Sequence, residues 1–201
     1  YYFVKKLNQF TSKKNDLFVD TGSCLAWIMQ DYKCKDNQRI FHDLNFTAMG
    51  WALPASLGAS TENKKRKIIC IVGDGSLMVN LQELSLINKY CKNFKLIIIN
   101  NSGYAMVKQT EDEWLNSKHF GTSKNDLIFP DFKKICSASN LNYTKFKNSS
   151  DLNKLKKIIN SKKNEVCEIF VPSEKQVEPQ VKFGHPIEDA HPLLDRKFIK
   201  K

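Results

Sequence analysis

The sequence contains very few arginines, although it is strongly basic. Lysine and arginine together number 32 against 21 acidic residues, for a formal net charge of +11, and the only arginines are Arg39, Arg66 and Arg196. Surfaces that bind nucleic acids rely on arginine for bidentate contacts to phosphate and guanine. Because most of the positive charge is carried by lysines scattered along the chain, we expect no nucleic-acid partner.

The sequence also lacks a long apolar run and a recognisable secretory signal. No apolar stretch approaches the roughly 20 residues that a membrane-spanning helix needs, so we expect no membrane partner. The 201 residues, 41% of them hydrophobic, suffice for one well-buried α/β domain. The chain begins with Tyr1 and not with Met, so we expect it to be part of a longer polypeptide.

The six cysteines form no Cys-x-x-Cys pair and no cluster with histidine, so their spacing gives no indication of a zinc site. Cys70 and Cys167 lie in apolar runs, where a reduced and buried thiol is the usual state. These features favour a cytoplasmic protein.

Two short apolar runs, each ending in polar residues, are the clearest feature that is present. Residues 67–72 are apolar and β-branched, as in a strand buried on both faces of a parallel sheet, and Gly73-Asp74-Gly75-Ser76 follows directly. A second apolar run, residues 96–99, ends in Asn100-Asn101. Between the two runs, helical spacing relates Leu77, Leu81, Leu84 and Ile87.

Both polar clusters are expected at the carboxyl ends of parallel strands, where open α/β sheets bind ligands. Asp74 offers a carboxylate and Asn101 an amide oxygen, which are hard ligands suited to Mg²⁺ or Ca²⁺. Gly75 and Ser76 begin a helix, whose free N–H groups favour a phosphate. The pair therefore predicts a cation beside a diphosphate, whereas each half alone would be an ordinary strand–turn–helix with a polar turn.

This combination resembles the signature of the thiamine-diphosphate enzymes, in which Gly-Asp-Gly is followed by about one helix and one strand and then by Asn-Asn. Three further segments are similar to the acetolactate synthase group of that family: residues 46–55, 79–84 and 100–107. The resemblance covers nearly the whole chain, but only as one of the family's three domains, the C-terminal cofactor-binding domain. It implies thiamine diphosphate and Mg²⁺ as cofactors, with the metal held by Asp74, Asn101 and the carbonyl of Gly103.

The resemblance also implies a second phosphate site, in the turn that follows an apolar run at residues 17–19. In acetolactate synthases this turn usually carries Gln-His, where this chain has Ser23-Cys24. Cys24 at a helix start could have a lowered pKa, or it could be a small residue that fits the turn. The complete set of candidate cofactor-binding residues is Thr21, Gly22, Ser23, Cys24, Ala48, Met49, Gly75, Ser76, Asn101, Gly103, Tyr104 and Ala105.

Met49 is the candidate catalytic residue. By resemblance it is the bulky side chain that forces the cofactor into a bent shape, so that proton abstraction becomes intramolecular. The alternative is an apolar residue that packs on the core at a helix start. For His42, which is a lone histidine, a satisfied structural role is expected.

Strand patterns alternate with helix patterns along the chain, which predicts an α/β fold with a parallel sheet of about six strands and helices on both faces. The expected strands are residues 17–19, 39–42, 67–72, 96–99, 141–144 and 166–171. A short helix is expected over residues 108–117. Residues 1–171 should form the cofactor-binding domain. Residues 172–201, interrupted by four prolines, should form an extended C-terminal tail that wraps a neighbour or is flexible.

The resemblance implies an enzyme that decarboxylates a 2-oxo acid, most simply pyruvate, and transfers the resulting acyl carbanion to a carbonyl acceptor. In acetolactate synthases a tryptophan follows the glutamine that corresponds to Gln109, whereas this chain has Thr110. We therefore expect an acceptor larger than pyruvate or 2-oxobutyrate, such as a keto-sugar or a nucleotide-linked sugar.

The resemblance further implies partners. The family's glutamate that contacts the cofactor's aminopyrimidine belongs to a pyrimidine-binding domain, on the same or a partner subunit, and this chain contains no such domain. The chain alone is therefore expected to be inactive, and a homodimer or homotetramer is expected. A site for FAD would lie mainly in the missing middle domain, so the question of FAD stays open.

Two other functions are compatible with the sequence. One is a separate small subunit of a 2-oxo acid decarboxylase, such as those that act on sulfopyruvate or phosphonopyruvate. The other is a binding module without chemistry, in which the metal site only stabilises a dimer.

Overall fold

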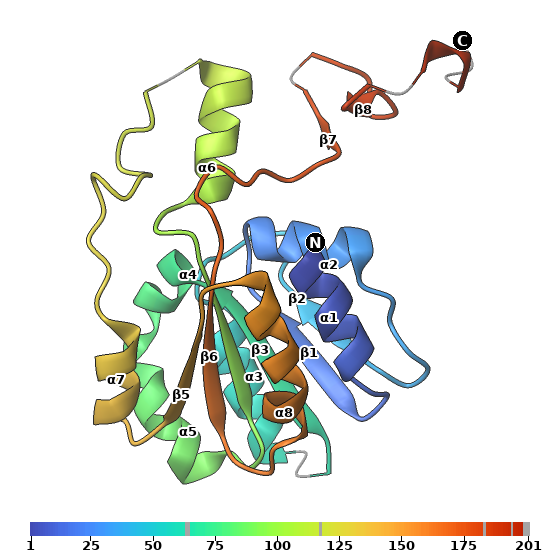
Figure 1. Cartoon of the computed structure of the whole chain (residues 1–201). Helices are drawn as coiled ribbons and strands as arrows, with labels where there is room; N and C mark the ends of the chain where they lie inside the picture. The colour runs from blue at the N-terminus through green and yellow to red at the C-terminus, as the bar shows by residue number, and fades with distance from the viewer. Residues whose placement is uncertain (63–64, 117, 183, 194, 199–201) are drawn as a thin grey trace.

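The computed structural model arranges the chain in three layers, with a six-stranded sheet between two layers of helices (Figure 1). The structure describes residues 1–62, 65–116, 118–182, 184–193 and 195–198. Within that part of the chain, no helix has the length and apolar character needed to cross a membrane. The α/β fold predicted from the alternating patterns is confirmed.

All six strands of the sheet run parallel. They are β1 (Asn15–Val19), β2 (Ile40–His42), β3 (Lys67–Gly73), β4 (Lys95–Asn100), β5 (Asn142–Phe146) and β6 (Glu165–Phe170). Their order across the sheet is β2-β1-β3-β4-β6-β5. Each lies within a few residues of its predicted range, because apolar β-branched runs of this length are distinctive of buried parallel strands.

The first helix precedes β1, and the other main helices lie between strands in the sequence. They are α1 (Tyr2–Phe10), α2 (Ser23–Asp31), α3 (Ala52–Glu62), α4 (Asp74–Val79), α5 (Leu84–Tyr90), α6 (Ala105–Thr110), α7 (Phe132–Ala138) and α8 (Leu155–Asn160). The helix predicted over residues 108–117 begins earlier, at Ala105, and continues as a π-helical turn, Glu111–Leu115. The last residue of that predicted range, Ser117, lies outside the described residues.

The two faces of the sheet bury separate apolar clusters. Along β4, Ile97 and Ile99 face α1, α2 and α8, whereas Leu96 and Ile98 face α3, α5 and α7. This alternation follows from the two-residue period of a strand. Because both faces are covered, nearly every side chain of the central strands is apolar, which is what made them recognisable.

The helical spacing from Leu77 to Ile87 does not correspond to one helix. The chain leaves helical geometry at Asn80, where φ is −132°, and passes through a 3₁₀ turn before α5 begins. The Asn80 side chain donates a hydrogen bond to the carbonyl of Gly50. Asparagine favours such side-chain bonds to backbone over the interior of a helix. The break therefore ties the end of α4 to the loop that carries Met49.

A crevice is expected between the carboxyl ends of β1 and β3. The connection that leaves β1 places α2 on one face of the sheet, and the connection that leaves β3 continues into α5 on the other face. Neighbouring parallel strands whose connections depart to opposite faces leave such a crevice, which is where doubly wound folds bind ligands.

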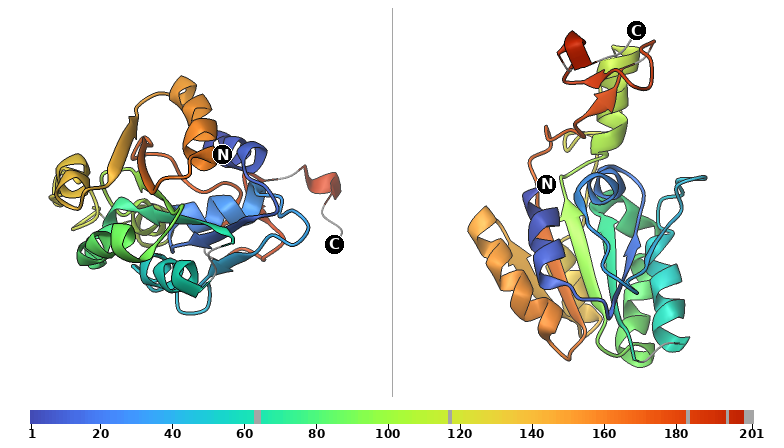
Figure 2. Two further views of the ribbon diagram at one scale, coloured as in Figure 1. Left: turned by 90° about the horizontal axis from the view of Figure 1, so that it is seen from below. Right: turned by 90° about the vertical axis from the view of Figure 1, so that its right-hand side faces the viewer.

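The tail that follows β6 is extended, but it also contains a short pair of antiparallel strands, which was not predicted from the sequence. The pair consists of β7 (Gln180–Val181) and β8 (Ala190–His191). The chain that leads into it passes the base of α6 in Figure 1, and Figure 2 shows the pair on the same side of the sheet as α6. Leu194 lies outside the described residues. The boundary between domain and tail at residue 171 stays a prediction.

The first residues of the tail are held by the same chain. Val177 is buried, and its backbone exchanges two hydrogen bonds with the side chain of Gln109 on α6, at 2.8 and 2.9 Å. On α2, the Trp27 indole donates to the Gln176 carbonyl at 3.4 Å and the Gln30 amide donates to the Pro179 carbonyl at 2.9 Å. This segment therefore connects α2 with α6.

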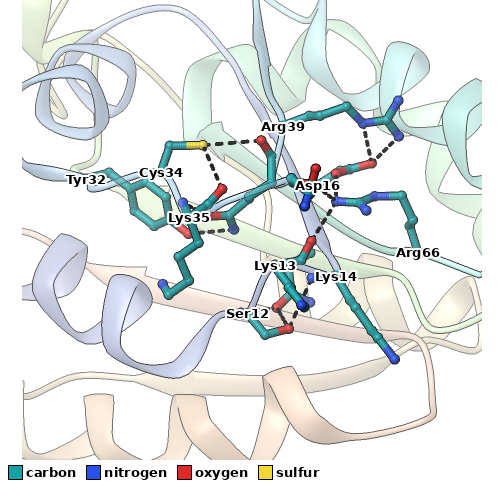
Figure 3. A network of polar contacts seen from close by, with 12 residues as sticks. Ser12, Lys13, Lys14, Asp16, Tyr32, Cys34, Lys35, Arg39 and Arg66 are labelled. Carbon is teal, nitrogen blue, oxygen red and sulfur yellow. Dashed lines mark hydrogen bonds and ion pairs between the residues drawn. The ribbon is translucent and has the colours of Figure 1, made fainter.

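An ion-pair network centred on a buried carboxylate lies at the amino end of β1, the end of the strand away from the tail (Figure 3). The Asp16 side chain on β1 is only 1% exposed and pairs with Arg39 and Arg66, each at an N–O distance of 2.5 Å. Arg66 also donates to two loop carbonyls, those of Lys13 and Asn37, at 2.9 Å each. Burial raises the pKa of Asp16, but the hydrogen bonds and charges of Arg66 and Arg39 outweigh it and hold the pKa below its ordinary value.

We predict that Asp16→Asn destabilises the fold by about 1–3 kcal/mol, because charge-assisted hydrogen bonds are lost from a buried site. A depressed pKa stabilises the folded state only while the carboxyl is ionised. The difference from the unsubstituted protein should therefore be present above about pH 4 and shrink as the pH falls below it. Thermal unfolding of the full-length protein across this range measures the difference, with exposed Asp36→Asn as the matched control. A pH-independent difference would contradict the assignment.

Candidate functional site

A cavity of about 260 Å³ opens at the carboxyl edge of the sheet, where the connections that follow β1, β2, β3 and β4 meet. It lies over the crevice between β1 and β3. The lining residues are Thr21, Gly22, Ser23, Cys24, Thr47, Met49, Gly73, Asp74, Gly75, Ser76, Ile99, Asn101, Gly103, Tyr104, Ala105, Met106 and Val107.

The cavity brings together every candidate cofactor-binding and metal residue except Ala48. Ala48 lies in the turn before Met49, where its N–H points toward the Asp43 carboxylate at 3.4 Å, and it does not line the cavity. Five lining residues were not predicted from the sequence, namely Thr47, Gly73, Ile99, Met106 and Val107. Each lies within two residues of a predicted residue, so their proximity in the sequence was the signal that could have found them.

Asp74 joins two of the connections that surround the cavity. Its side chain is 1% exposed, and its two oxygens accept hydrogen bonds from the N–H groups of Gly75, at 3.0 Å, and Gly103, at 3.3 Å. Burial raises the pKa of Asp74 to about 6, and the backbone N–H groups oppose that rise. A cation beside this carboxylate would favour its ionised form.

Asn101 presents an oxygen that lacks a partner. Its Oδ1 is buried and makes no hydrogen bond with any described residue. A buried acceptor left unpaired is unfavourable, and such an atom usually faces water or an ion. An amide oxygen beside a carboxylate suits a hard cation such as Mg²⁺. The described residues contain no group of three or more His, Cys, Asp or Glu side chains that could hold a metal.

The turn after β1 also fits an anion. The Ser23 hydroxyl lines the cavity, is buried, and has no hydrogen-bond partner among the described residues. It lies in the first turn of α2, where backbone N–H groups are free and the helix dipole favours negative charge. The residues present therefore fit a phosphate at this turn and a hard cation beside Asp74.

Cys24 does not have the lowered pKa that its place at a helix start suggested. Its thiol is buried and donates to the carbonyls of Asp20, at 3.2 Å, and Thr21, at 3.3 Å. Burial, and to a lesser extent the nearby Asp20 charge, raises the pKa of Cys24 to about 12. The lowered-pKa interpretation is wrong, and Cys24 is a small residue that fits the turn.

Two glycines are required by close contacts at the site. A Cβ on Gly75 would lie 2.1 Å from the ring of Tyr104, and one on Gly103 would lie 2.4 Å from the backbone oxygen of Thr122. The Tyr104 ring and the chain at Thr122 can approach only because these positions carry no side chain. The connections after β3 and β4 are therefore packed directly against each other.

Met49 is 38% exposed and lines the cavity, so it is not a buried core residue. Its loop is fixed by Asp20, a residue that the sequence analysis missed. The buried Asp20 carboxylate accepts hydrogen bonds from the N–H groups of Gly50, at 3.1 Å, and Ala52, at 2.8 Å. Asn80 holds the Gly50 carbonyl from the other side. The expectation for His42 is not met, because its buried Nδ1 has no partner among the described residues.

Comparison with known proteins identifies similar chains. Residues 20–169 match the family model for the thiamine pyrophosphate enzyme, C-terminal TPP binding domain. The acetolactate synthase large subunit of Lactococcus lactis is 25% identical over 184 residues, which is 90% of this chain and 31% of the relative. Chloroplastic acetolactate synthase 2 of Zea mays is 28% identical over 200 residues, which is 96% of this chain and 31% of the relative. The chloroplastic acetolactate synthase of Arabidopsis thaliana is 26% identical over 195 residues, which is 94% of this chain and 29% of the relative. The chain thus spans less than a third of these relatives.

We predict that Asp20→Ala loosens the Met49 loop, because two backbone N–H groups lose their acceptor at a cost of about 0.5–2 kcal/mol. Hydrogen exchange of the Gly50 and Ala52 amides in the full-length protein should become faster. The control is Asp43→Ala, which removes a carboxylate from the same loop whose hydrogen bonds are long, at 3.4 Å. Equal exchange in the two variants would contradict the role of Asp20.

Proposed function

The chain belongs to the thiamine pyrophosphate (thiamine diphosphate) enzymes, as their C-terminal cofactor-binding domain, and we propose that it holds the diphosphate and Mg²⁺ in an acetolactate synthase-like enzyme. That enzyme would decarboxylate a 2-oxo acid, most simply pyruvate, and transfer the remaining acyl group to a carbonyl acceptor. The observation that carries the proposal is the buried Asp74 carboxylate in one cavity with the unpaired oxygen of Asn101.

Each group in the cavity has a proposed part. Asp74, Asn101 and the carbonyl of Gly103 would bind Mg²⁺, since all three supply hard oxygen ligands. Gly75 and Ser76, at the start of α4, would lie against the diphosphate, with the N–H group of Ser76 as the donor, since the Gly75 N–H group donates to Asp74. Thr21, Gly22, Ser23 and Cys24 would hold the terminal phosphate, with the unpaired Ser23 hydroxyl as a donor. Tyr104 and Ala105, which line the cavity, and Ala48, which does not, complete the proposed set.

Met49 would support the bent shape of the cofactor. When bound, thiamine diphosphate supplies a carbon nucleophile and an electron sink for the loss of CO₂. A half-exposed methionine fixed by Asp20 and Asn80 can restrict which conformation fits the cavity. Holding reacting groups together in this way can contribute several kcal/mol to lowering a barrier. None of the proposed metal ligands takes a proton from the substrate.

The whole enzyme needs more than this chain. The pyrimidine-binding domain, on the same or a partner subunit, would supply the glutamate that the cofactor requires, so this chain alone would be inactive. We propose a homodimer or homotetramer on that ground. The cytoplasmic location stays a prediction, and the question of FAD in a further domain stays open.

We predict that Asp74→Ala lowers Mg²⁺-dependent affinity for thiamine diphosphate by more than about 100-fold, because removing a direct ligand should exceed the loss seen for groups behind ligands. The measurement is isothermal titration calorimetry of the full-length protein, with and without Mg²⁺. Exposed Asp126→Ala, on a surface loop, is the control. Unaltered affinity of Asp74→Ala for thiamine diphosphate would contradict the proposed function.

The acceptor is proposed to be larger than pyruvate or 2-oxobutyrate. Thr110 lies one turn beyond Met106 on α6, and its hydroxyl donates to the Met106 carbonyl at 3.1 Å. Residues four apart lie on the same face of a helix, so Thr110 lies beside the cavity-lining Met106 without lining the cavity itself. Tryptophan at this position would fill space that threonine leaves open.

We predict that the full-length enzyme, given pyruvate and a panel of carbonyl acceptors, uses a keto-sugar or nucleotide-linked sugar in preference to a second pyruvate. Thr110→Trp should reverse that preference, because an indole covers about 150–250 Å² when buried. Release of CO₂ and product mass report the outcome, and Thr110→Ser is the matched control. Efficient self-condensation of pyruvate that competing sugars do not reduce would return the protein to ordinary acetolactate synthesis.

A further inference from the structure

A buried carboxylate lies behind the proposed metal site. Glu168, on β6, is 4% exposed and does not line the cavity. The amide Nδ2 of Asn100, the last residue of β4, donates to Glu168 Oε1 at 2.5 Å. The hydroxyl of Tyr143, on β5, donates to Glu168 Oε2. Three strands thus contribute to one polar network inside the sheet.

The other end of the Asn100 amide holds the turn that enters the cavity. Asn100 Oδ1 accepts from the backbone N–H of Ser102 at 2.9 Å and lies 3.4 Å from the Ser102 hydroxyl. Ser102 has a φ of +57°, in the left-handed region that residues other than glycine rarely adopt. Such a conformation persists only where its surroundings impose it. The same turn carries Asn101 and Gly103, the two proposed metal ligands that follow β4.

The Glu168 carboxylate fixes the orientation of the Asn100 side-chain amide. An amide can present either its oxygen or its NH₂ group, whereas an ionised carboxylate only accepts hydrogen bonds. Glu168 therefore binds the NH₂ group and leaves the oxygen for Ser102. Burial and the Glu168 charge raise the pKa of Tyr143, so its hydroxyl stays protonated and donates.

We propose that Glu168 is a positioning residue for the metal site, because through Asn100 it fixes the turn that presents Asn101 and Gly103. The inference rests on the proposed function, since the turn matters in this way only if a cation binds there. Groups that orient metal ligands from behind typically change metal affinity by about 10–100-fold when they are altered. As a purely structural element a buried carboxylate is a costly choice, because removing it from water is unfavourable.

The test uses two substitutions that together reverse the direction of the hydrogen bond between Asn100 and Glu168. Asn100→Asp removes the donor that faces Glu168 and places two carboxylates together, while keeping an oxygen for Ser102. In the full-length protein, the Mg²⁺ concentration that half-saturates thiamine diphosphate binding should rise about 10–100-fold. Adding Glu168→Gln should restore most of the affinity, because the new amide can donate to the new carboxylate and still accept from Tyr143. The two single variants and the double variant form a double-mutant cycle.

A structural role alone predicts a different result. The cofactor-free unfolding midpoint is measured for each variant alongside calorimetric binding. Asp16→Asn, which opens a buried carboxylate network at the far edge of the sheet, should lower the midpoint without changing the Mg²⁺ dependence. If Asn100→Asp does not fold, Glu168→Met serves instead, since it leaves the Asn100 amide without its acceptor at similar side-chain size.

The outcomes separate this inference from the proposed function. Weakened Mg²⁺ dependence that the double variant restores supports the role of Glu168. Unchanged Mg²⁺ dependence in Asn100→Asp or Glu168→Met, or no recovery in the double variant, overturns it. If Asp74→Ala abolishes binding while the cycle shows no coupling, the proposed function stands and only this inference fails. If the unsubstituted protein shows no Mg²⁺-dependent binding, both fail.

Discussion

The pair of hydrogen bonds that Asp74 accepts is the interaction on which the site depends. One bond comes from the start of the helix that follows β3, and the other comes from the turn that follows β4. Neighbouring parallel strands end at the same edge, but this alone does not bring their connections into contact. The buried Asp74 carboxylate favours that contact, because its desolvation is unfavourable until both connections supply an N–H group. The glycines at 75 and 103 allow the approach.

Most of the fold could be predicted from the sequence, for a physical reason. Parallel strands covered on both faces are mostly apolar, so β3 and β4 are visible as apolar runs at residues 68–72 and 96–99. Residues placed at the ends of these strands are brought together by the sheet itself. The cavity lining could therefore be predicted at Asp74 and Asn101 without knowledge of any contact between them.

Other features depend on contacts that local sequence does not encode. The break at Asn80 arises because its side chain bonds to Gly50, 30 residues earlier in the chain. Asn100 and Glu168 are separated by 68 residues, and neither position alone indicates a network. The pKa of Cys24 follows from burial, which a helix start does not reveal, so the sequence left a lowered pKa open as one of two interpretations. Short-range pattern specifies the elements, whereas such long-range bonds specify how their ends are held.

The shape of the cavity depends in part on residues 176–179, although this segment does not line the cavity. Through Trp27 and Gln30 it is bound to the helix whose first turn lines one side, and through Gln109 to the helix whose Met106 lines the other. The spacing of the two walls is therefore set partly by four residues of tail. Divergence in that tail between related enzymes could change the breadth of accepted substrates while every lining residue stays the same, so a comparison restricted to lining residues would miss the cause.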